Sequence, residues 1–255
     1  MQDQVARIRS YFDSCAGEYA RERERGFSFA TQKRLALEML PPRLGRVLDL
    51  GCGPALLAES LLERAEEFWG IDISAQMIAH GRARMETHVQ RGRCHLSVGN
   101  AEALDFPSGS FDAVVSLGML EYLLTCERAL AETLRVLRPG GIAVFAVPNR
   151  ASAYHRAGLV TARLRSLVKR LLGRAPRASE RFVTNRCVPS RLDRALERAG
   201  FQKLDGRYCN FIFHPLHELH AGASLAINRR LTALGQPRLA PWLGSQYVVS
   251  ARKPL

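Results

Sequence analysis

Two glycines near the start of the chain lie where a loop could hold a small molecule. They are Gly51 and Gly53, within the segment Asp49–Ala55, which directly follows a short apolar run. Glycine lets the backbone turn sharply and lets a ligand approach closely, and a helix that starts there offers free N–H groups to an anion. Because position 56 is Leu, the G-x-G-x-x-G fingerprint of dinucleotide binders is incomplete. The glycines alone therefore indicate a ligand-binding loop and leave the ligand open.

An acidic residue, Asp72, follows the next apolar run, Phe68–Ile71, about 20 residues after the glycine loop. A carboxylate at the end of the second strand of a βαβ unit commonly accepts hydrogen bonds from ribose hydroxyls. The alternative is an Asp that caps a helix or belongs to a loop. The glycine loop and Asp72 together favour a ligand that carries a ribose.

Candidate proton-transfer residues lie further along the chain. Ligands meet a parallel sheet at the carboxyl ends of its strands, so Tyr122, just after the fourth apolar run, is a candidate catalytic residue. His155 and His214 are candidate bases. His217 and His220 are one helical turn apart and could form a base or a metal site. A surface or packing role is favoured for this pair, and no metal site is expected.

The elements that must position these residues alternate between strand and helix patterns. Residues 1–40 have a helical pattern that ends at Pro41-Pro42. We expect strands at 46–50, 67–71, 94–98, 111–117 and 142–147, and helices at 54–66, 74–89 and 127–137. Beyond Pro148 we expect a helix at 189–199, an extended segment at 201–213, a helix at 217–234 and a strand at 246–252. This alternation predicts an α/β fold with a parallel sheet that is covered on both faces.

Three further segments complete an ordered set of motifs: Gly99–Pro107, Phe111–Ser116 and Leu137–Gly141. With them, residues 40–150 resemble the class I S-adenosylmethionine-dependent methyltransferases, in the branch that contains the ubiquinone and menaquinone methyltransferases. The resemblance implies a Rossmann-like, seven-stranded, mostly parallel sheet with helices on both faces. It also implies an N-terminal helical lid, S-adenosyl-L-methionine as the cofactor, and an inserted basic helical segment after the fifth strand.

The resemblance assigns roles to individual residues, with the methionine portion of the cofactor near Asp49 and the ribose near Asp72. The cofactor contacts it implies are Asp49, Gly51, Cys52, Gly53, Asp72, Ile73, Met77, Asn100, Ala101, Ser116 and Leu117. Asn100 stands where the family often has Asp, and Ala55 stands at the third glycine position; both changes are expected to preserve binding. Tyr122 stands where relatives frequently show His. Cys52 is expected to be a small packing residue.

The N-terminal segment carries aromatic residues, Tyr11 and Tyr19 among them, that resemble the lid helices of this family. The alternative is a set of core aromatics at helical spacing, and the two roles are compatible. The segment Arg21–Arg25 alternates in charge, which indicates a solvated surface.

Length and composition favour a single domain, 1–255, with 47% hydrophobic residues. Within it we expect a lid at 1–40, a cofactor-binding core at 41–150, a basic insertion at 151–186, and C-terminal strands with a helical insertion at 187–255. No apolar run is long enough to span a bilayer, and the N-terminus lacks the pattern of a secretory signal. Six cysteines without metal or disulfide spacing favour reduced thiols in the cytoplasm.

The net charge of +13 is concentrated in one segment. Residues 150–186 contain ten Lys or Arg and one acid, which amounts to +9. Within them, 153–172 combine an apolar stripe with basic residues, a pattern typical of helices that lie on an acidic membrane. The alternatives are a packed helix with a solvated basic face, or a nucleic-acid contact.

The sequence therefore predicts a methyltransferase that O-methylates a lipophilic small molecule, such as a quinone-, porphyrin- or lipid-like acceptor. We expect it at or near the inner face of a membrane, as a peripheral protein. An RNA methyltransferase is the first alternative, but neither an Asn-Pro-Pro-Tyr motif nor interleaved basic and aromatic residues support a nucleic-acid partner. A non-catalytic cofactor-binding protein is the second, and the intact Asp49, Gly51, Gly53 and Asp72 argue against it.

Overall fold

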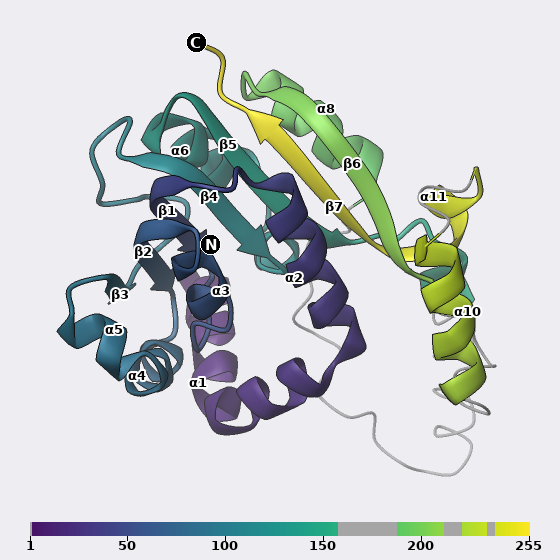
Figure 1. Cartoon of the computed structure of the whole chain (residues 1–255), viewed down its shortest axis with the longest axis horizontal. Helices are drawn as coiled ribbons and strands as arrows, with labels where there is room; N and C mark the ends of the chain where they lie inside the picture. Colours follow the sequence, from purple (N-terminus) through teal and green to yellow (C-terminus); the bar gives the residue numbers. More distant parts are fainter. Residues whose placement is uncertain (1, 158–187, 212–220, 234–237) are drawn as a thin grey trace.

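The computed structural model describes residues 2–157, 188–211, 221–233 and 238–255, and all structural statements below concern these residues. Their strands form one seven-stranded sheet in the order β3-β2-β1-β4-β5-β7-β6 (Figure 1). The strands are β1 (Leu44–Leu50), β2 (Ala65–Asp72), β3 (Cys94–Val98), β4 (Phe111–Leu117), β5 (Leu137–Pro148), β6 (Gln202–Phe211) and β7 (Gly244–Arg252). Only the pairs made by β7 are antiparallel. The expected mostly parallel, Rossmann-like sheet is confirmed.

The helices cover both faces of this sheet. They are α1 (Gln2–Arg25), α2 (Phe27–Met39), α3 (Ala58–Leu62), α4 (Ala75–Arg84), α5 (Glu86–Gln90), the 3-10 turn η1 (Leu120–Tyr122), α6 (Glu127–Val136), α8 (Pro189–Arg198), α10 (Ala221–Ala233) and α11 (Ala240–Leu243). Helices α2 and α3 pack on one face, and α6 and α8 pack on the other (Figure 1). Helix α1 packs against α4, beside the sheet edge where β1 and β2 end.

Two apolar clusters, one on each face, show why the central strands are almost uniformly hydrophobic. Successive side chains of a strand point to opposite faces. In β4, Ala113 and Val115 belong to the cluster under α2 and α3, whereas Val114 belongs to the cluster under α6 and α8. In β5, Val144 and Phe145 divide in the same way. The central strand β4 is accordingly apolar at nearly every position, whereas the outer strands β3 and β6 are partly exposed and more polar.

Local backbone geometry explains where the expected elements differ from the observed ones. The helix expected at 54–66 is limited to Ala58–Leu62, because Ala55 has a φ of 58° and the chain is still turning there. The helix expected at 74–89 breaks at Met85 into α4 and α5. The expected N-terminal helix is two helices that separate at Gly26. Of these two, α2 packs on the sheet and contributes only Phe29 to the pocket described below, whereas α1 contributes several lining residues.

The basic segment lies mostly outside the described residues. Of the proposed membrane-binding stretch 153–172, only 153–157 are described, and they form a short helix after β5. His214, His217 and His220 also fall outside the described part of the chain. None of the helices in the described ranges is both long and apolar enough to cross a bilayer.

Candidate functional site

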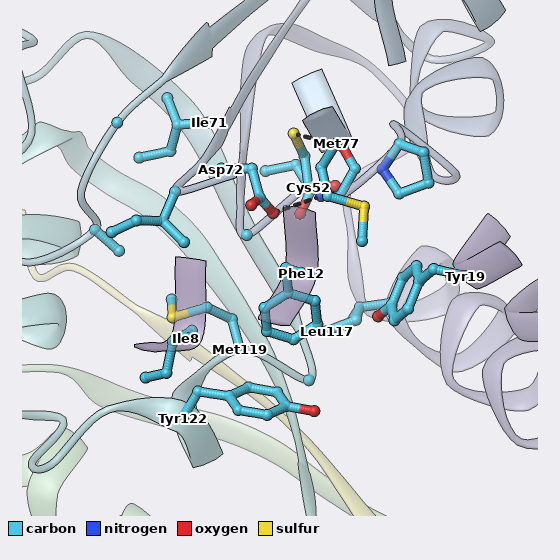
Figure 2. A pocket seen from close by; sticks show the side chains of 18 of the residues that line it. Ile8, Phe12, Tyr19, Cys52, Ile71, Asp72, Met77, Leu117, Met119 and Tyr122 are labelled. Carbon is cyan, nitrogen blue, oxygen red and sulfur yellow. Dashed lines mark hydrogen bonds between the residues drawn. The ribbon is translucent and has the colours of Figure 1, made fainter. Parts of the chain in front are cut away.

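The main cavity opens at the carboxyl ends of β1, β2 and β4, and residues of α1 form its opposite wall (Figure 2). Its volume, including the open mouth, is about 1000 Å³. Its lining combines apolar side chains with a few polar groups, as is usual for small-molecule sites. The carboxyls of Asp49 and Asp72 lie at the ends of β1 and β2, and an aromatic pair lies between α1 and η1.

The glycine loop forms the floor of the polar end. Gly51 and Gly53 have φ angles of 70° and 53°, a left-handed conformation that favours glycine. The N–H groups of Gly51 and Cys52 both donate to the carbonyl of Ile71, at 2.9 and 3.0 Å, which ties the loop to β2. A Cβ atom at Gly51 would lie 2.7 Å from Met119 Cβ, so a larger residue there would force η1 away.

Asp72 is held rigidly at the end of β2. Its Oδ2 accepts a hydrogen bond from Gly53 N, and its Oδ1 accepts one from Ser74 N, both at 2.9 Å. Burial raises the pKa of this carboxyl, and the hydrogen bonds from Ser74, Gly53 and Ile73 oppose the rise. Each carboxylate oxygen has a second lone pair, so both can still accept the two hydroxyls of a ribose.

Asp49 is fully buried at the end of β1. Burial and the nearby charge of Asp72 raise its pKa to about 8, and Arg23 partly counteracts them. Two carboxyls confined in one pocket favour a bound cation, because a positive charge would offset both burial and their mutual repulsion. The ammonium and sulfonium groups of S-adenosylmethionine supply such charges.

Arg23 is a pocket residue that the sequence analysis missed. Its guanidinium donates a hydrogen bond from Nη2 to Leu117 O at 2.7 Å and lies 4.9 Å from the ring centre of Phe29. The expectation of a solvated surface holds for the other residues of Arg21–Arg25, which are exposed, but is wrong for Arg23. Among the described residues that line the pocket, Arg23 is the one cation. It can therefore pair with a carboxylate of a ligand.

The residues expected near an adenine line the same cavity. Ile73, Met77, Asn100 and Ala101 all belong to its wall. Asn100 Oδ1 accepts a hydrogen bond from Glu102 N at 2.9 Å, which orients its amide and leaves one lone pair for a ligand amine. Ser116 is different: it is fully buried and donates to Leu50 O at 2.9 Å, outside the lining residues. Its neighbour Leu117 lines the pocket.

The apolar end of the pocket lies between α1 and η1. Figure 2 shows Phe12 between the Asp72 side of the cavity and Tyr122, with Ile8 and Met119 beside them. The ring of Phe12 meets Tyr122 and Tyr19 edge-on, with centroids 5.1 and 5.9 Å apart. Tyr19 thus lines the pocket, whereas Tyr11 is exposed on α1 and lies outside the lining.

The candidate catalytic residues occupy different environments. Tyr122 lines the pocket, and burial beside Glu121 raises the pKa of its phenol far above the usual range, so it stays protonated. His155 lies outside the lining, where its Nδ1 is 3.0 Å from Ser152 Oγ; burial and Arg150 lower its pKa to about 4. The imidazole of His155 is therefore neutral and forms a local contact with Ser152, away from the pocket.

Glu121 is a further acidic group near the apolar end, which the sequence analysis did not select. It is buried, its Oε2 has no hydrogen-bond partner among the described residues, and its Oε1 lies 3.4 Å from where a Cβ of Gly118 would be. Burial raises its pKa to about 7. Gly118 lines the pocket, whereas Glu121 lies beside it and outside the lining. Glu121 can therefore hold or release a proton near neutral pH.

Cys52 lines the pocket as a protonated thiol. Burial, reinforced by Asp49 and Asp72, raises its pKa well above the usual value, and its Sγ packs near Gly70. A thiol in this state is a poor nucleophile. Within the described ranges, no cluster of three or more His, Cys, Asp or Glu could hold a metal ion.

Comparisons with known proteins agree with this site. Residues 48–145 match the family described as "Methyltransferase domain". The chain is 32% identical to a ubiquinone/menaquinone biosynthesis C-methyltransferase of Hydrogenovibrio crunogenus, over 55% of this chain and 58% of the relative. It is 36% identical to a ubiquinone biosynthesis O-methyltransferase of Alkalilimnicola ehrlichii, over 41% of this chain and 42% of the relative. The matches thus span about half the length of these relatives.

A solved structure has the same fold over nearly the whole chain. It is an S-adenosylmethionine-dependent methyltransferase of Thermotoga maritima, with a TM-score of 0.64 and 19% identity over 96% of this chain and 99% of that one. The sequence match includes the glycine loop, Asp72 and the motif segments named above. Residues 48–145 are therefore similar to the domain of methyltransferases that take S-adenosylmethionine as cofactor, and the chain shares the fold of these enzymes.

Proposed function

We propose that this chain methylates a hydroxyl group of a lipophilic small molecule, with the acceptor held at the apolar end of the pocket. The observation that carries the proposal is the division of one cavity into two ends. Asp49 and Asp72 lie at the ends of β1 and β2, and Phe12 and Tyr122 meet edge-on between α1 and η1. Arg23 lies beside Leu117 and Gly118. Such a cavity can place a charged donor against an uncharged acceptor, and alignment of this kind is worth roughly 7–11 kcal/mol of the barrier.

The charged residues would hold the donor. Asp72 would accept the ribose hydroxyls, Arg23 would bind the carboxylate, and Asp49 would offset the positive charge. The cofactor supplies an electrophilic methyl group on a sulfonium centre. Because Gly51 and Gly53 have no side chains, the cofactor could approach the backbone of the loop closely. Met77 and Ala101 would enclose the adenine.

The acceptor side is supported by side-chain chemistry and by the names of relatives. Val5, Ile8, Met119 and Leu123 also line the pocket. A ring or an isoprenoid-like chain bound against them would remove its apolar surface from water, which is favourable. Both curated relatives described above are named for ubiquinone biosynthesis. A hydroxyl acceptor must also lose its proton, and we assign this role to Glu121, whose pKa of about 7 and position beside the lining residue Gly118 support it. A lipophilic acceptor fits an enzyme that works at or near a membrane surface.

Two measurements test the proposal in order. Calorimetry with S-adenosylmethionine should show one site per chain, and Asp72→Asn should weaken it strongly, because a neutral amide accepts ribose hydroxyls less well. Transfer of labelled methyl should then occur to hydroxylated aromatic compounds with apolar substituents. Absence of cofactor binding by the folded chain would refute methyl transfer. Labelling of RNA in place of all such small molecules would assign the enzyme to the RNA-modifying class instead.

A further inference from the structure

An exposed aromatic and apolar pair lies on α11, away from the pocket lining. Trp242 and Leu239 expose 58% and 61% of their surfaces. The guanidinium carbon of Arg156 lies 5.4 Å from the ring centre of Trp242, so a cation from the 153–157 helix covers part of this ring. These two segments, residues 149–157 and 238–246, together form what we call the α11 surface.

The α11 surface is fixed to the sheet by one buried side chain. Asn149, just after β5, donates from Nδ2 to Pro241 O at 2.8 Å and to Gly244 O at 2.9 Å. Its backbone N–H donates to Ser245 O at 2.8 Å, and its carbonyl accepts from Ser152 N at 3.0 Å. The side-chain amide of Asn149 thus links the two segments, and these hydrogen bonds hold the backbone beside Trp242 in place.

The charge of this surface has a single sign. Residues 149–157 and 238–246 contain three arginines, Arg150, Arg156 and Arg238, and no Asp or Glu. Arg156 and Arg238 are exposed. In the sequence, the first segment leads directly into the most basic stretch of the chain. A surface that has tryptophan beside arginine and no acidic residue suits the interface of an anionic bilayer, where apolar acyl chains meet negatively charged headgroups.

We infer that the α11 surface docks on an anionic lipid bilayer, with Trp242 and Leu239 entering the headgroup region and Arg156 and Arg238 facing lipid phosphates. The inference rests on the proposed function, because it gives a lipophilic acceptor a route from the membrane. The surface adjoins the carboxyl end of β5, which pairs with β4, and the pocket opens at the carboxyl end of β4. Docking would therefore bring the pocket side of the sheet toward the lipid.

Tryptophan fluorescence tests the docking directly, because the chain has only two tryptophans, Trp69 and Trp242. In the variant Trp69→Phe, vesicles of phosphatidylglycerol and phosphatidylcholine should shift the emission to the blue, and brominated lipid should quench it. Vesicles of phosphatidylcholine alone should do neither. In case Trp69→Phe fails to fold, the same lipid-induced shift should be present in the native chain and absent from Trp242→Phe.

Substitutions of charged and apolar residues can show whether the α11 surface itself, and not the overall positive charge of the chain, causes vesicle binding. The double variant Arg156→Glu with Arg238→Glu should weaken partitioning at least ~10-fold, given ~1 kcal/mol per basic residue near acidic lipid. Leu239→Ser should weaken it as well. The matched controls are Arg91→Glu, an exposed arginine after α5, and Leu204→Ser, 42% exposed on β6. Both controls should bind vesicles like the native chain.

Several results would overturn the inference. One is vesicle binding without any change in Trp242 emission, which would place the membrane contact elsewhere on the chain. Another is a blue shift that grows with protein concentration in the absence of lipid, which would assign the surface to a second copy of the chain. A third is a shift with RNA alone. Cofactor binding is measured without lipid, so the proposed function and this inference can fail separately.

Discussion

The carboxylate of Asp13 on α1 accepts a hydrogen bond from Ser74 Oγ at 2.6 Å. Ser74 Oγ also accepts from Met77 N at 3.1 Å and so caps α4, while Ser74 N donates to Asp72. Three residues from separate elements therefore link the helix over the pocket to the carboxylate expected to bind the ribose. This link is a physical reason for cofactor binding and the position of α1 to depend on each other.

We expect Asp13→Ala to weaken S-adenosylmethionine binding by about tenfold, because a hydrogen bond to a charged group is worth ~1.5–3 kcal/mol and only part of it reports on the cofactor. Asp13→Asn keeps the Oδ1 acceptor and should lose less. Calorimetry gives the affinities, and hydrogen exchange of α1 should show faster opening in Asp13→Ala. If Asp13→Ala changed neither the affinity for S-adenosylmethionine nor the hydrogen exchange of α1, the position of α1 would not depend on cofactor binding through this link.

Arg23 should determine the affinity for the carboxylate of the cofactor. Arg23→Ala is expected to weaken S-adenosylmethionine binding roughly 10- to 100-fold, the value of a charge-assisted hydrogen bond. Decarboxylated S-adenosylmethionine lacks the group that Arg23 would bind, so its affinity should change little.

Gly118→Ala provides a second test of Arg23 without removing the arginine. The new Cβ would lie 2.8 Å from Arg23 Nη2 and would displace the guanidinium. Because Gly118 has a φ of 86°, the variant also strains the backbone, an effect common to both forms of the cofactor. It should therefore reproduce the selective loss for the carboxylated cofactor. Equal losses for both forms of the cofactor, in both variants, would show that Arg23 supports the fold of the pocket and not its ligand.

The sequence was sufficient for the sheet and for most of the cofactor end of the pocket. The central strands are apolar runs buried on both faces, so the sequence alone locates them, as at Phe111–Leu117. The edge strand Cys94–Val98 also has the expected bounds. The glycine loop and Asp72 lie at the ends of such strands, so their positions in the fold can be predicted from the sequence as well. Ala55 shows the limit: its left-handed φ delays α3, which helical periodicity does not reveal.

Arg23 and Glu121 could not be found from local pattern, because their environment comes from elements far away in the chain. Arg23 has charged neighbours on both sides and reaches Leu117, 94 residues later, only after α1 has packed across the sheet. Glu121 looks like any acid in a loop until β4 and the 149–157 segment enclose it. Tyr11 and Tyr19 differ only by the face of α1 they occupy, and the sequence expected both at the pocket.

Asp49 makes stability depend on pH in a predictable direction. Its pKa is raised from 3.8 to about 8, so between these values the folded chain binds more protons than the unfolded chain, and the free energy of unfolding falls as pH rises. Asp49→Asn should therefore stabilise the cofactor-free chain at pH 9 by roughly 2–4 kcal/mol, at about 1.4 kcal/mol per pKa unit discounted for coupling with Asp72.

Urea unfolding at two pH values checks this prediction. Near pH 4 the Asp49 carboxyl is protonated in the folded chain and only partly ionised in the unfolded chain. Asp49→Asn and the native chain should therefore differ little in stability. At pH 9 the variant should be more stable while binding S-adenosylmethionine more weakly. Equal stability of the two chains at pH 9 would mean that the Asp49 carboxyl is not disfavoured in its charged form.

Glu121 should impose a pH dependence on methyl transfer. The ratio kcat/KM reports the free enzyme and should rise with pH through about 7, as burial raises the pKa of this carboxyl to that value. Glu121→Gln should lower the rate ~100-fold or more, the usual contribution of a general base, and should remove this limb of the profile. A lowered rate with the limb intact would assign Glu121 a structural role.

Tyr122→Phe should leave kcat within about threefold of the native value, far less than the 10²–10⁴-fold loss expected for a general base. The reason is that the buried phenol has a pKa well above neutrality and stays protonated, so it cannot accept a proton from the acceptor. Its ring is what matters, since it meets Phe12 edge-on at 5.1 Å and forms the apolar wall.

Tyr122→Ala should accordingly raise the KM of a lipophilic acceptor while S-adenosylmethionine affinity changes little, because the aromatic pair contributes ~0.5–1.5 kcal/mol beyond its buried area. Tyr208→Ala is the matched control, since Tyr208 is partly exposed on β6 and lies outside the pocket lining. Steady-state kinetics with an apolar hydroxylated acceptor separate the two parameters. A large fall in kcat for Tyr122→Phe, with KM unchanged, would instead give the phenol oxygen a direct part in the chemistry.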